Sequence, residues 1–164
     1  MKRKTSQAKS DENSCNCTAL RKASRRISQL YDSALSSCGL KTTQRSILAQ
    51  IRRSQPTTVG NLATALVMDS GALAHTLKPL ERDGLVAIDI DPEDRRNRLI
   101  TLTLLGRKRL SDSDDLWENA QRAFEKAFGR VKSDAVREAM RLLVSNDFAA
   151  TFEETLASAR EGSI

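Results

Sequence analysis

The segment from Asp91 to Arg98 carries six charged side chains in eight residues. They are three acids and three arginines: Asp91, Glu93, Asp94, Arg95, Arg96 and Arg98. Their charges nearly cancel, so the segment is not a simple basic patch, even though each guanidinium can pair with a phosphate. Ordered loops of this length more often carry function than merely connect two elements. A solvated charged turn is the alternative interpretation.

The three cysteines are the residues that could do redox chemistry. An odd number of cysteines in a chain expected to be cytoplasmic does not indicate a disulfide framework. Cys15 and Cys17 come at the start of the predicted first helix, where free backbone amides and nearby Arg21 and Arg25 favour a thiolate. Three uses remain open: a redox switch at Cys17, a cysteine that lines a small-molecule pocket, and metal coordination through Cys15 and Cys17.

The elements that position these residues begin with two short helices between residues 58 and 85. Leucines and other apolar residues recur at helical spacing in both, on either side of Asp69-Ser70-Gly71. Asp69 or Ser70 is a suitable N-cap for the second helix. Small or polar residues occupy the outward face of its first half: Ser70, Gly71, Ala72, Ala74, His75 and Thr76. With Lys78 and Arg82 further along, such a helix can enter a DNA major groove and pair with phosphates.

Two short strands follow the second helix. Val86, Ile88 and Ile90 alternate with polar residues, as do Ile100 and Leu102, which predicts one buried and one solvated face in each strand. The arginine-containing loop joins them, so the segment is a hairpin. A helix-turn-helix followed by a hairpin is a winged helix.

At this level of detail the sequence resembles one family of bacterial transcription factors, the multiple antibiotic resistance regulator (MarR) family. The resemblance extends from about residue 17 to about residue 156 and rests on three segments: 42–48, 73–86 and 91–96, the last leading to Leu102-Thr103 and Gly106-Arg107. It implies a homodimer in which each subunit lays one helix in the major groove of double-stranded DNA and one wing in or over the minor groove. Asp94 would then hold Arg96 in position at the wing tip. Ser70 and His75 stand where the family often has arginine, so base preference does not carry over.

The region around Cys17 is similar to the peroxide-sensing branch of the same family. In that branch the matching cysteine is oxidised and tyrosines hydrogen-bond to it; Tyr31 fits this pattern, whereas Thr42 stands where a further tyrosine occurs. The family resemblance also suggests aromatic acids as ligands, with Arg21 as the partner of the carboxylate. The implied effector is therefore a peroxide or a small aromatic acid.

Length and composition indicate a single domain with a tail. Residues 1–13 are polar and basic without periodicity, which predicts a disordered arm. We expect residues 14–164 to form one winged-helix domain, with a DNA-binding core over 40–110 and dimerisation helices over 14–38 and 111–164. No apolar run approaches the ~18 residues that span a membrane, and no signal peptide follows the first residues. We therefore expect a cytoplasmic protein without a membrane partner.

The charge is divided unevenly along the chain. Residues 1–110 hold 20 Lys and Arg against 10 Asp and Glu, whereas residues 111–164 hold 7 against 11. This asymmetry favours a phosphate-facing region at one end of the molecule. The acidic part is predicted to be helical, with one apolar stripe ending at Gly129 and another from Val136 to Leu156. Together with the first helix these stripes are typical of an intertwined dimer interface, the alternative being the core of a monomer.

We therefore predict a mainly α fold with a small β-hairpin wing: a winged helix-turn-helix with N- and C-terminal dimerisation helices. The predicted function is a dimeric repressor that a ligand or oxidant releases from a near-palindromic operator. His75 is the only histidine, and without a second one we expect it to contact a base or a phosphate; no metal site or cofactor is predicted. The alternatives are a thiol peroxidase built on Cys17, which lacks an obvious base, and a winged helix used only for protein contacts.

Overall fold

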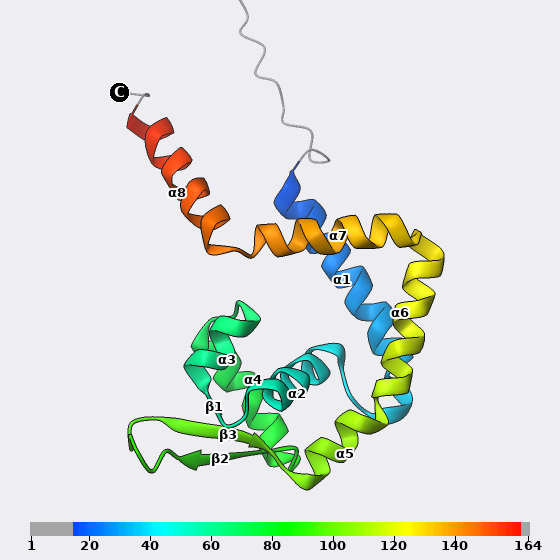
Figure 1. Ribbon diagram of the computed structural model, residues 1–164, viewed down its shortest axis with the longest axis vertical. Helices are drawn as coiled ribbons and strands as arrows, with labels where there is room; N and C mark the ends of the chain where they lie inside the picture. The colour runs from blue at the N-terminus through cyan, green and yellow to red at the C-terminus, as the bar shows by residue number, and fades with distance from the viewer. Residues whose placement is uncertain (1–14, 162–164) are drawn as a thin grey trace, which may run out of the picture.

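The computed structural model describes residues 15–161, which form eight α-helices, one short 3-10 helix and three strands (Figure 1). The arm predicted over residues 1–13 lies outside the described residues. The first half contains α1 (Asn16–Ala34), η2 (Ser36–Cys38), α2 (Thr42–Ser54), β1 (Thr57–Thr58), α3 (Val59–Leu66) and α4 (Ser70–Arg82). The second half contains β2 (Val86–Ile90), β3 (Arg98–Leu102), α5 (Leu104–Asp112), α6 (Asp114–Phe128), α7 (Arg130–Leu143) and α8 (Asn146–Glu161). None of the helices in the described part is long and apolar enough to cross a membrane.

The elements α2 to α5 form the winged head. Its core is aliphatic and includes Leu48 of α2, Leu62 of α3, Leu77 of α4 and Ile100 of β3, each at most 1% exposed. Of the two predicted N-caps, Asp69 and Ser70, Asp69 caps α4: its carboxylate accepts hydrogen bonds from the backbone N–H groups of Gly71 (2.9 Å) and Ala72 (3.0 Å). Helix α4 then continues through Pro79 to Arg82.

The sheet has the strand order β1-β3-β2 and is antiparallel throughout. Strands β2 and β3 pair with Val86 opposite Leu102 and Ile90 opposite Arg98, so Arg98 belongs to a strand and not to the loop. The sequence predicted that one face of each hairpin strand is buried, but this face is buried only at the base of the hairpin, near α4 and α5. Val86 is 2% exposed, whereas Ile90 is 58% exposed, because the hairpin extends beyond the core that covers its base. The two-residue strand β1 was not predicted.

The segment Leu102-Thr103-Leu104-Leu105-Gly106 joins the wing to α5. The Thr103 hydroxyl donates to Gly84 O (2.6 Å) and accepts from the Gly106 N–H (2.9 Å), so one side chain caps α5 and holds the turn before β2. A Cβ on Gly106 would lie 1.9 Å from the backbone carbonyl oxygen of Leu85. This clash could be relieved only by moving the backbone. Only glycine allows α5 to pack this closely on the base of the wing.

Each of the two apolar stripes predicted for the C-terminal part is divided between two helices. The first breaks at Ser113 between α5 and α6, where the buried Ser113 hydroxyl donates to Leu110 O (2.6 Å). The second breaks around Ser145, whose hydroxyl accepts from the Phe148 N–H (3.2 Å) at the start of α8. The predicted stop at Gly129 is confirmed.

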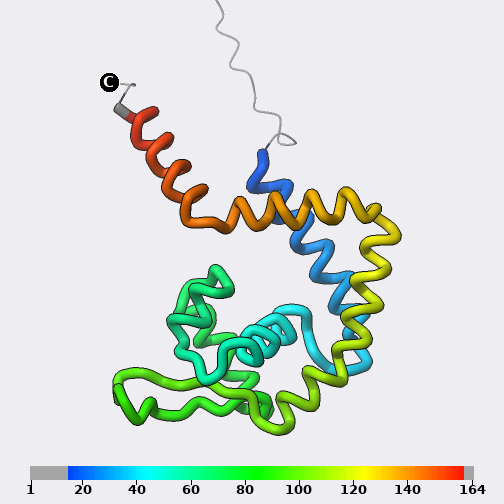
Figure 2. Tube along the Cα trace, viewed as in Figure 1, coloured from blue at the N-terminus to red at the C-terminus, as the bar shows by residue number. Residues whose placement is uncertain are grey.

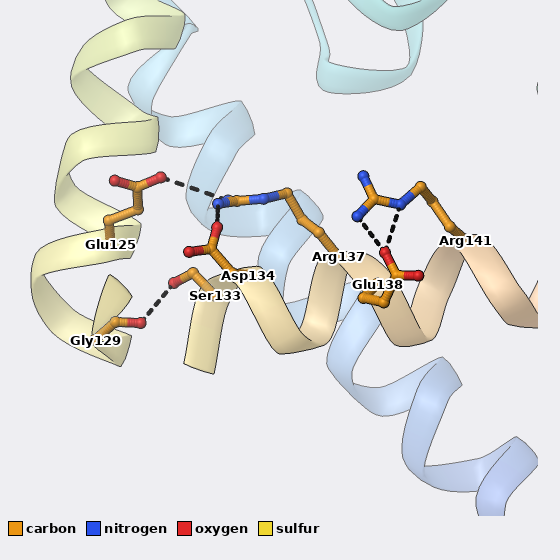
Figure 3. A network of polar contacts seen from close by, with 7 residues as sticks. All are labelled: Glu125, Gly129, Ser133, Asp134, Arg137, Glu138 and Arg141. Carbon is orange, nitrogen blue, oxygen red and sulfur yellow. Dashed lines mark hydrogen bonds and ion pairs between the residues drawn. The ribbon is translucent and has the colours of Figure 1, made fainter. Parts of the chain in front are cut away.

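Beyond the head, α6 runs beside α1, α7 starts at the end of α6 and passes across α1 in this view, and α8 leads away from the rest of the chain (Figures 1 and 2). Polar contacts hold the corner between α6 and α7 (Figure 3). The Ser133 hydroxyl donates to Gly129 O (2.9 Å), and Arg137 pairs with Glu125 of α6 (3.4 Å) and with Asp134. These contacts link the first turns of α7 to the end of α6. The side chains of α8 from Asn146 to Arg160 are all exposed.

Candidate nucleic-acid interface

Helix α4 has a buried side and an exposed side. Leu73, Leu77 and Leu80 are at most 1% exposed and anchor the helix in the head. Five of the predicted DNA-contacting residues of this helix are exposed: Ser70, Gly71, His75, Lys78 and Arg82. The exposed side carries no bulky side chain in its first turn, because Ser70, Gly71 and Ala72 occupy it. A duplex could therefore approach the first turn of α4 closely.

Thr76, Lys78 and Arg82 differ in what they can offer a ligand. Thr76 is half-buried and its hydroxyl donates to Ala72 O (2.9 Å), so it is less available to a base than His75 is. The Arg82 guanidinium donates to the neighbouring Asp83 carboxylate (3.1 Å), which offsets part of its charge. Lys78 has no ion-pair partner among residues 15–161, so its ammonium is the freest cation on this helix.

The turn at the wing tip is organised by Asp94. Its Oδ1 accepts from the Arg96 backbone N–H (3.0 Å) and its Oδ2 from the Asn97 side-chain amide (3.3 Å). The Arg96 Nε lies 3.7 Å from Asp94 Oδ1, and the Arg96 side chain is 95% exposed. Asp94 therefore holds the backbone of the turn, and the guanidinium of Arg96 remains in solvent.

The other two wing arginines are also exposed. Arg98 donates from Nη1 to the carbonyl oxygens of Arg95 (3.2 Å) and Asn97 (3.3 Å), so its side chain folds back on the loop. Arg95 and Arg96 are the two guanidinium groups that the loop presents outward. The structure thus brings the exposed side of α4 and an arginine-bearing wing into one head, as the sequence predicted.

The cysteines and their predicted partners are dispersed in a single chain. Cys15 and Cys17 are exposed at the start of α1. Hydrogen bonds from the hydroxyl and backbone N–H of Thr18 lower the pKa of the Cys15 thiol below its usual value. Tyr31 lies 14 residues after Cys17, which is about 21 Å along an α-helix, so the two do not meet within one chain. The Tyr31 hydroxyl donates instead to Gln121 of α6 (2.7 Å).

Arg21 does not line the groove that lies beside it. That groove has a volume of about 520 Å³ and is lined from α1 by Leu20, Ala23, Ser24 and Ile27 among others, whereas Arg21 lies on the adjacent, exposed side of the helix. One chain alone therefore gives Arg21 no enclosed position for a carboxylate ligand. Its predicted role depends on what a second chain would add.

Sequence reasoning missed a buried polar junction between the head and α6. Arg45 of α2 is only 7% exposed and bonds to Ser113 and Asp114, with its guanidinium over the ring of Trp117. The signal in the sequence was Arg45 itself, which stands among the apolar positions of α2. Its partners lie nearly 70 residues away, so spacing could not identify them.

Comparisons with known proteins agree with this geometry. The model of the MarR family matches residues 40–97, from the start of α2 to the end of the wing loop. The chain is 36% identical over 102 residues to the transcriptional activatory protein BadR of Rhodopseudomonas palustris, a match that covers 58% of this chain and 53% of BadR. It is 31% identical over 87 residues to the organic hydroperoxide resistance transcriptional regulator of Bacillus subtilis, covering 53% of this chain and 59% of that protein. The chain thus spans somewhat more than half the length of these two relatives.

A solved structure extends the likeness to most of the chain. The Mycobacterium tuberculosis transcriptional regulator MosR, in complex with DNA, is 34% identical and superposes with a TM-score of 0.68. The match covers 77% of this chain and 95% of MosR. It therefore includes the helices outside the head as well as the head itself. With a family model over the head and a relative of this identity over nearly its whole length, the chain belongs to the MarR family of winged-helix transcription factors.

Proposed function

We propose that this protein is a homodimeric, sequence-specific DNA-binding regulator that represses transcription. The observation that carries the proposal is the two-sided character of α4, whose leucines are buried in the head while Ser70, Gly71, His75 and Lys78 are exposed. In this proposal the exposed side enters the major groove and the wing places Arg95 and Arg96 at the adjacent minor groove. The DNA present in the MosR complex supports the same assignment.

Helix α8 supports the homodimer. Its 16 residues include Phe148, Phe152 and Leu156, which share one face at a spacing of four and are 38–55% exposed. A helix of this length is marginally stable in water without tertiary packing, and its own chain buries none of its described side chains. A second copy is the occupant that best fits this face, because two DNA half-sites require a twofold symmetric protein. A bacterial DNA-binding role is consistent with the cytoplasmic location that we propose.

An oxidant or a small acid is the proposed releasing agent. Exposed thiols at Cys15 and Cys17 support the oxidant, and so does the name of the Bacillus subtilis relative, which refers to organic hydroperoxides. The acid is supported by the family resemblance and would use Arg21. One assay, release of the protein from DNA, distinguishes the oxidant from the acid. If the oxidant is the switch, peroxide releases wild-type protein from DNA, a thiol reductant restores binding, and Cys17→Ser stays bound.

The acid predicts the opposite pattern: Cys17→Ser still responds to an aromatic acid, and wild type ignores mild peroxide. Cys15→Ser is the matched control, since it removes a neighbouring exposed thiol and should alter the fate of the oxidised protein more than its formation. Catalysis by Cys17 remains the alternative function, and repeated turnover of peroxide with a thiol reductant would support it. The relatives reported above are transcriptional regulators, which favours regulation.

DNA binding itself is tested by selection from a random-sequence duplex library, followed by fluorescence anisotropy with the selected duplex at increasing salt. The proposal predicts a near-palindromic selected sequence and affinity that falls steeply with salt. Equal affinity for selected and random duplexes, or no binding at low salt, would refute it. The latter result would support a winged helix used only for protein contacts.

A further inference from the structure

Arg45 forms the only strongly buried cationic contact between the head and α6 that the described residues show. Its Nε donates to the hydroxyl of Ser113 (3.0 Å) and its Nη2 to the carboxylate of Asp114 (2.7 Å). The guanidinium carbon lies 4.3 Å from the ring centroid of Trp117. One side chain from α2 therefore contacts the residue that separates α5 from α6 and two residues of the first turn of α6.

The contact continues from α6 into α1. The rings of Trp117 and Tyr31 meet edge to face with centroids 4.9 Å apart, and the Tyr31 hydroxyl donates to Gln121. Burial lowers the pKa of Arg45, and the Asp114 carboxylate beside it acts in the opposite direction. The Asp114 carboxylate thus stabilises the positive charge of Arg45 in a desolvated environment. A buried charge costs free energy if its hydrogen bonds are lost. The junction therefore favours the one arrangement of α1, α2 and α6 in which these bonds form.

The geometry uses the fork of arginine. Ser113 and Asp114 receive hydrogen bonds from two different nitrogens of one planar group, whose face lies over Trp117. A lysine keeps the charge but cannot make both bonds and the planar contact at once. The Ser113 hydroxyl, fully buried, also donates to Leu110 O at the end of α5. The break between α5 and α6 is therefore held from both sides.

We propose that Arg45 is a positioning residue that fixes the angle between the winged head and α6, and thereby the separation of the two recognition helices in the dimer. This inference rests on the proposed function, because the separation matters only if both heads bind one duplex. Helices α6 to α8 carry the proposed dimer contacts, and the break at Ser113 is where the head joins them (Figure 1). Any rotation at that break moves α4 relative to its symmetry mate.

DNA offers a direct measure of this separation. Inserting one base pair between half-sites moves them apart by about 3.4 Å and rotates one by about 35° relative to the other. A dimer with rigid heads should lose affinity steeply with each insertion or deletion. A dimer with loosened heads should follow the half-sites and show a flatter dependence on spacing. The shape of the dependence, and not the overall affinity, reports the role of Arg45.

The experiment compares wild type, Arg45→Lys and Asp114→Asn on the duplex selected by wild type and on versions with one base pair inserted or removed at the centre. Lys108→Ala is the control, because it removes an exposed ion pair with Asp112 (2.8 Å) near the same break without touching the junction. For wild type and the control we expect about a tenfold loss of affinity per altered base pair. For Arg45→Lys and Asp114→Asn we expect less than about a threefold loss over the same series.

Trp117 gives a second measurement that requires no DNA, since it is the single tryptophan of the chain. Acrylamide should quench its fluorescence more strongly in Arg45→Lys than in wild type, while far-ultraviolet circular dichroism stays the same. An unchanged spacing profile in folded Arg45→Lys and Asp114→Asn, or an equal loss on every spacing, would overturn the proposal. Unchanged quenching would overturn the junction itself. A wild-type protein that binds no duplex would instead refute the proposed function, and the positioning role with it.

Discussion

Asp94 provides a decisive test of the wing, because removing its charge should have opposite effects in the two interpretations of the loop. If the acid only repels DNA phosphates, Asp94→Ala should tighten binding. If it holds the turn that presents Arg96, the same change should weaken binding. The structure favours the second outcome, since the carboxylate accepts from the Arg96 backbone N–H at 3.0 Å and from Asn97 Nδ2 at 3.3 Å.

The magnitude follows from these contacts. The ion pair with the Arg96 guanidinium contributes little, because the Nε lies 3.7 Å away on a side chain that is 95% exposed. Each hydrogen bond of the turn contributes about 0.5–1.5 kcal/mol, and a loosened turn must be ordered again when DNA binds. We therefore expect Asp94→Ala to weaken operator binding by about 1–2 kcal/mol, or roughly 5- to 30-fold. Arg96→Ala should weaken it by about 1–3 kcal/mol through loss of the DNA contact itself.

Asp94→Asn separates the hydrogen bonds from the charge. An asparagine retains the oxygen that accepts from the Arg96 backbone N–H but lacks the second acceptor that the Asn97 amide uses, so this variant should lose less affinity than Asp94→Ala. Fluorescence anisotropy with the selected duplex measures all three variants, and size-exclusion chromatography checks that each forms the same oligomer. Tighter binding by Asp94→Ala, or equal weakening by Asp94→Ala and Asp94→Asn, would refute the assignment of Asp94 to the turn.

Four further substitutions test other parts of the structure. His75→Ala should alter which operator positions determine the binding affinity. Lys78→Ala should instead weaken binding to selected and random duplexes alike and flatten the salt dependence. An equal loss of affinity on both duplexes for His75→Ala would exclude base reading by His75. Asp32 accepts from the Thr42 N–H at 2.6 Å, which lowers its pKa, so its contribution to stability is present above pH ~4 and lost as pH falls through the folded pKa. The melting-temperature difference between wild type and Asp32→Ala should accordingly vanish in acid. Val67→Gly should raise the melting temperature by about 2–4 °C, because Val67 is 68% exposed and has a φ of 52°, a left-handed conformation that costs a β-branched residue about 1–2 kcal/mol.

The features that the sequence could predict depend on residues close together in the chain. The cap at Asp69 acts on the next three residues, and the leucine spacing of α4 repeats within a single helix. The strand pairing of the wing joins segments that one loop connects, so alternation and loop length were sufficient. The head was therefore predictable from local patterns together with the family resemblance.

The features that were missed depend on contacts across the chain. Ser113, at the break between α5 and α6, accepts from Arg45, which is 68 residues away, and Tyr31 of α1 donates to Gln121, which is 90 positions later. Neither leaves a periodic signal. Apolar spacing alone predicted one stripe where the structure has α5 and α6, since spacing reports which residues are buried and not where a helix bends. The exposure of Ile90 was missed for a related reason: alternation does not say how far a core extends along a hairpin.

These long-range contacts also constrain how an effector could change DNA binding. Helix α1 is attached to the head at its C-terminal end, where Asp32 caps α2 and Tyr31 packs on the ring that carries Arg45. Cys17 lies about 21 Å from that end. Oxidation there can affect the head of its own chain only by moving α1 as a rigid body, or through contacts that a second chain supplies. In either case the free energy available is the difference between the effector's interaction with two dimer states, typically about 1–3 kcal/mol. A switch at Cys17 therefore requires a junction at Tyr31 and Arg45 that is stiff enough to transmit a movement of α1 and has a second arrangement close in free energy.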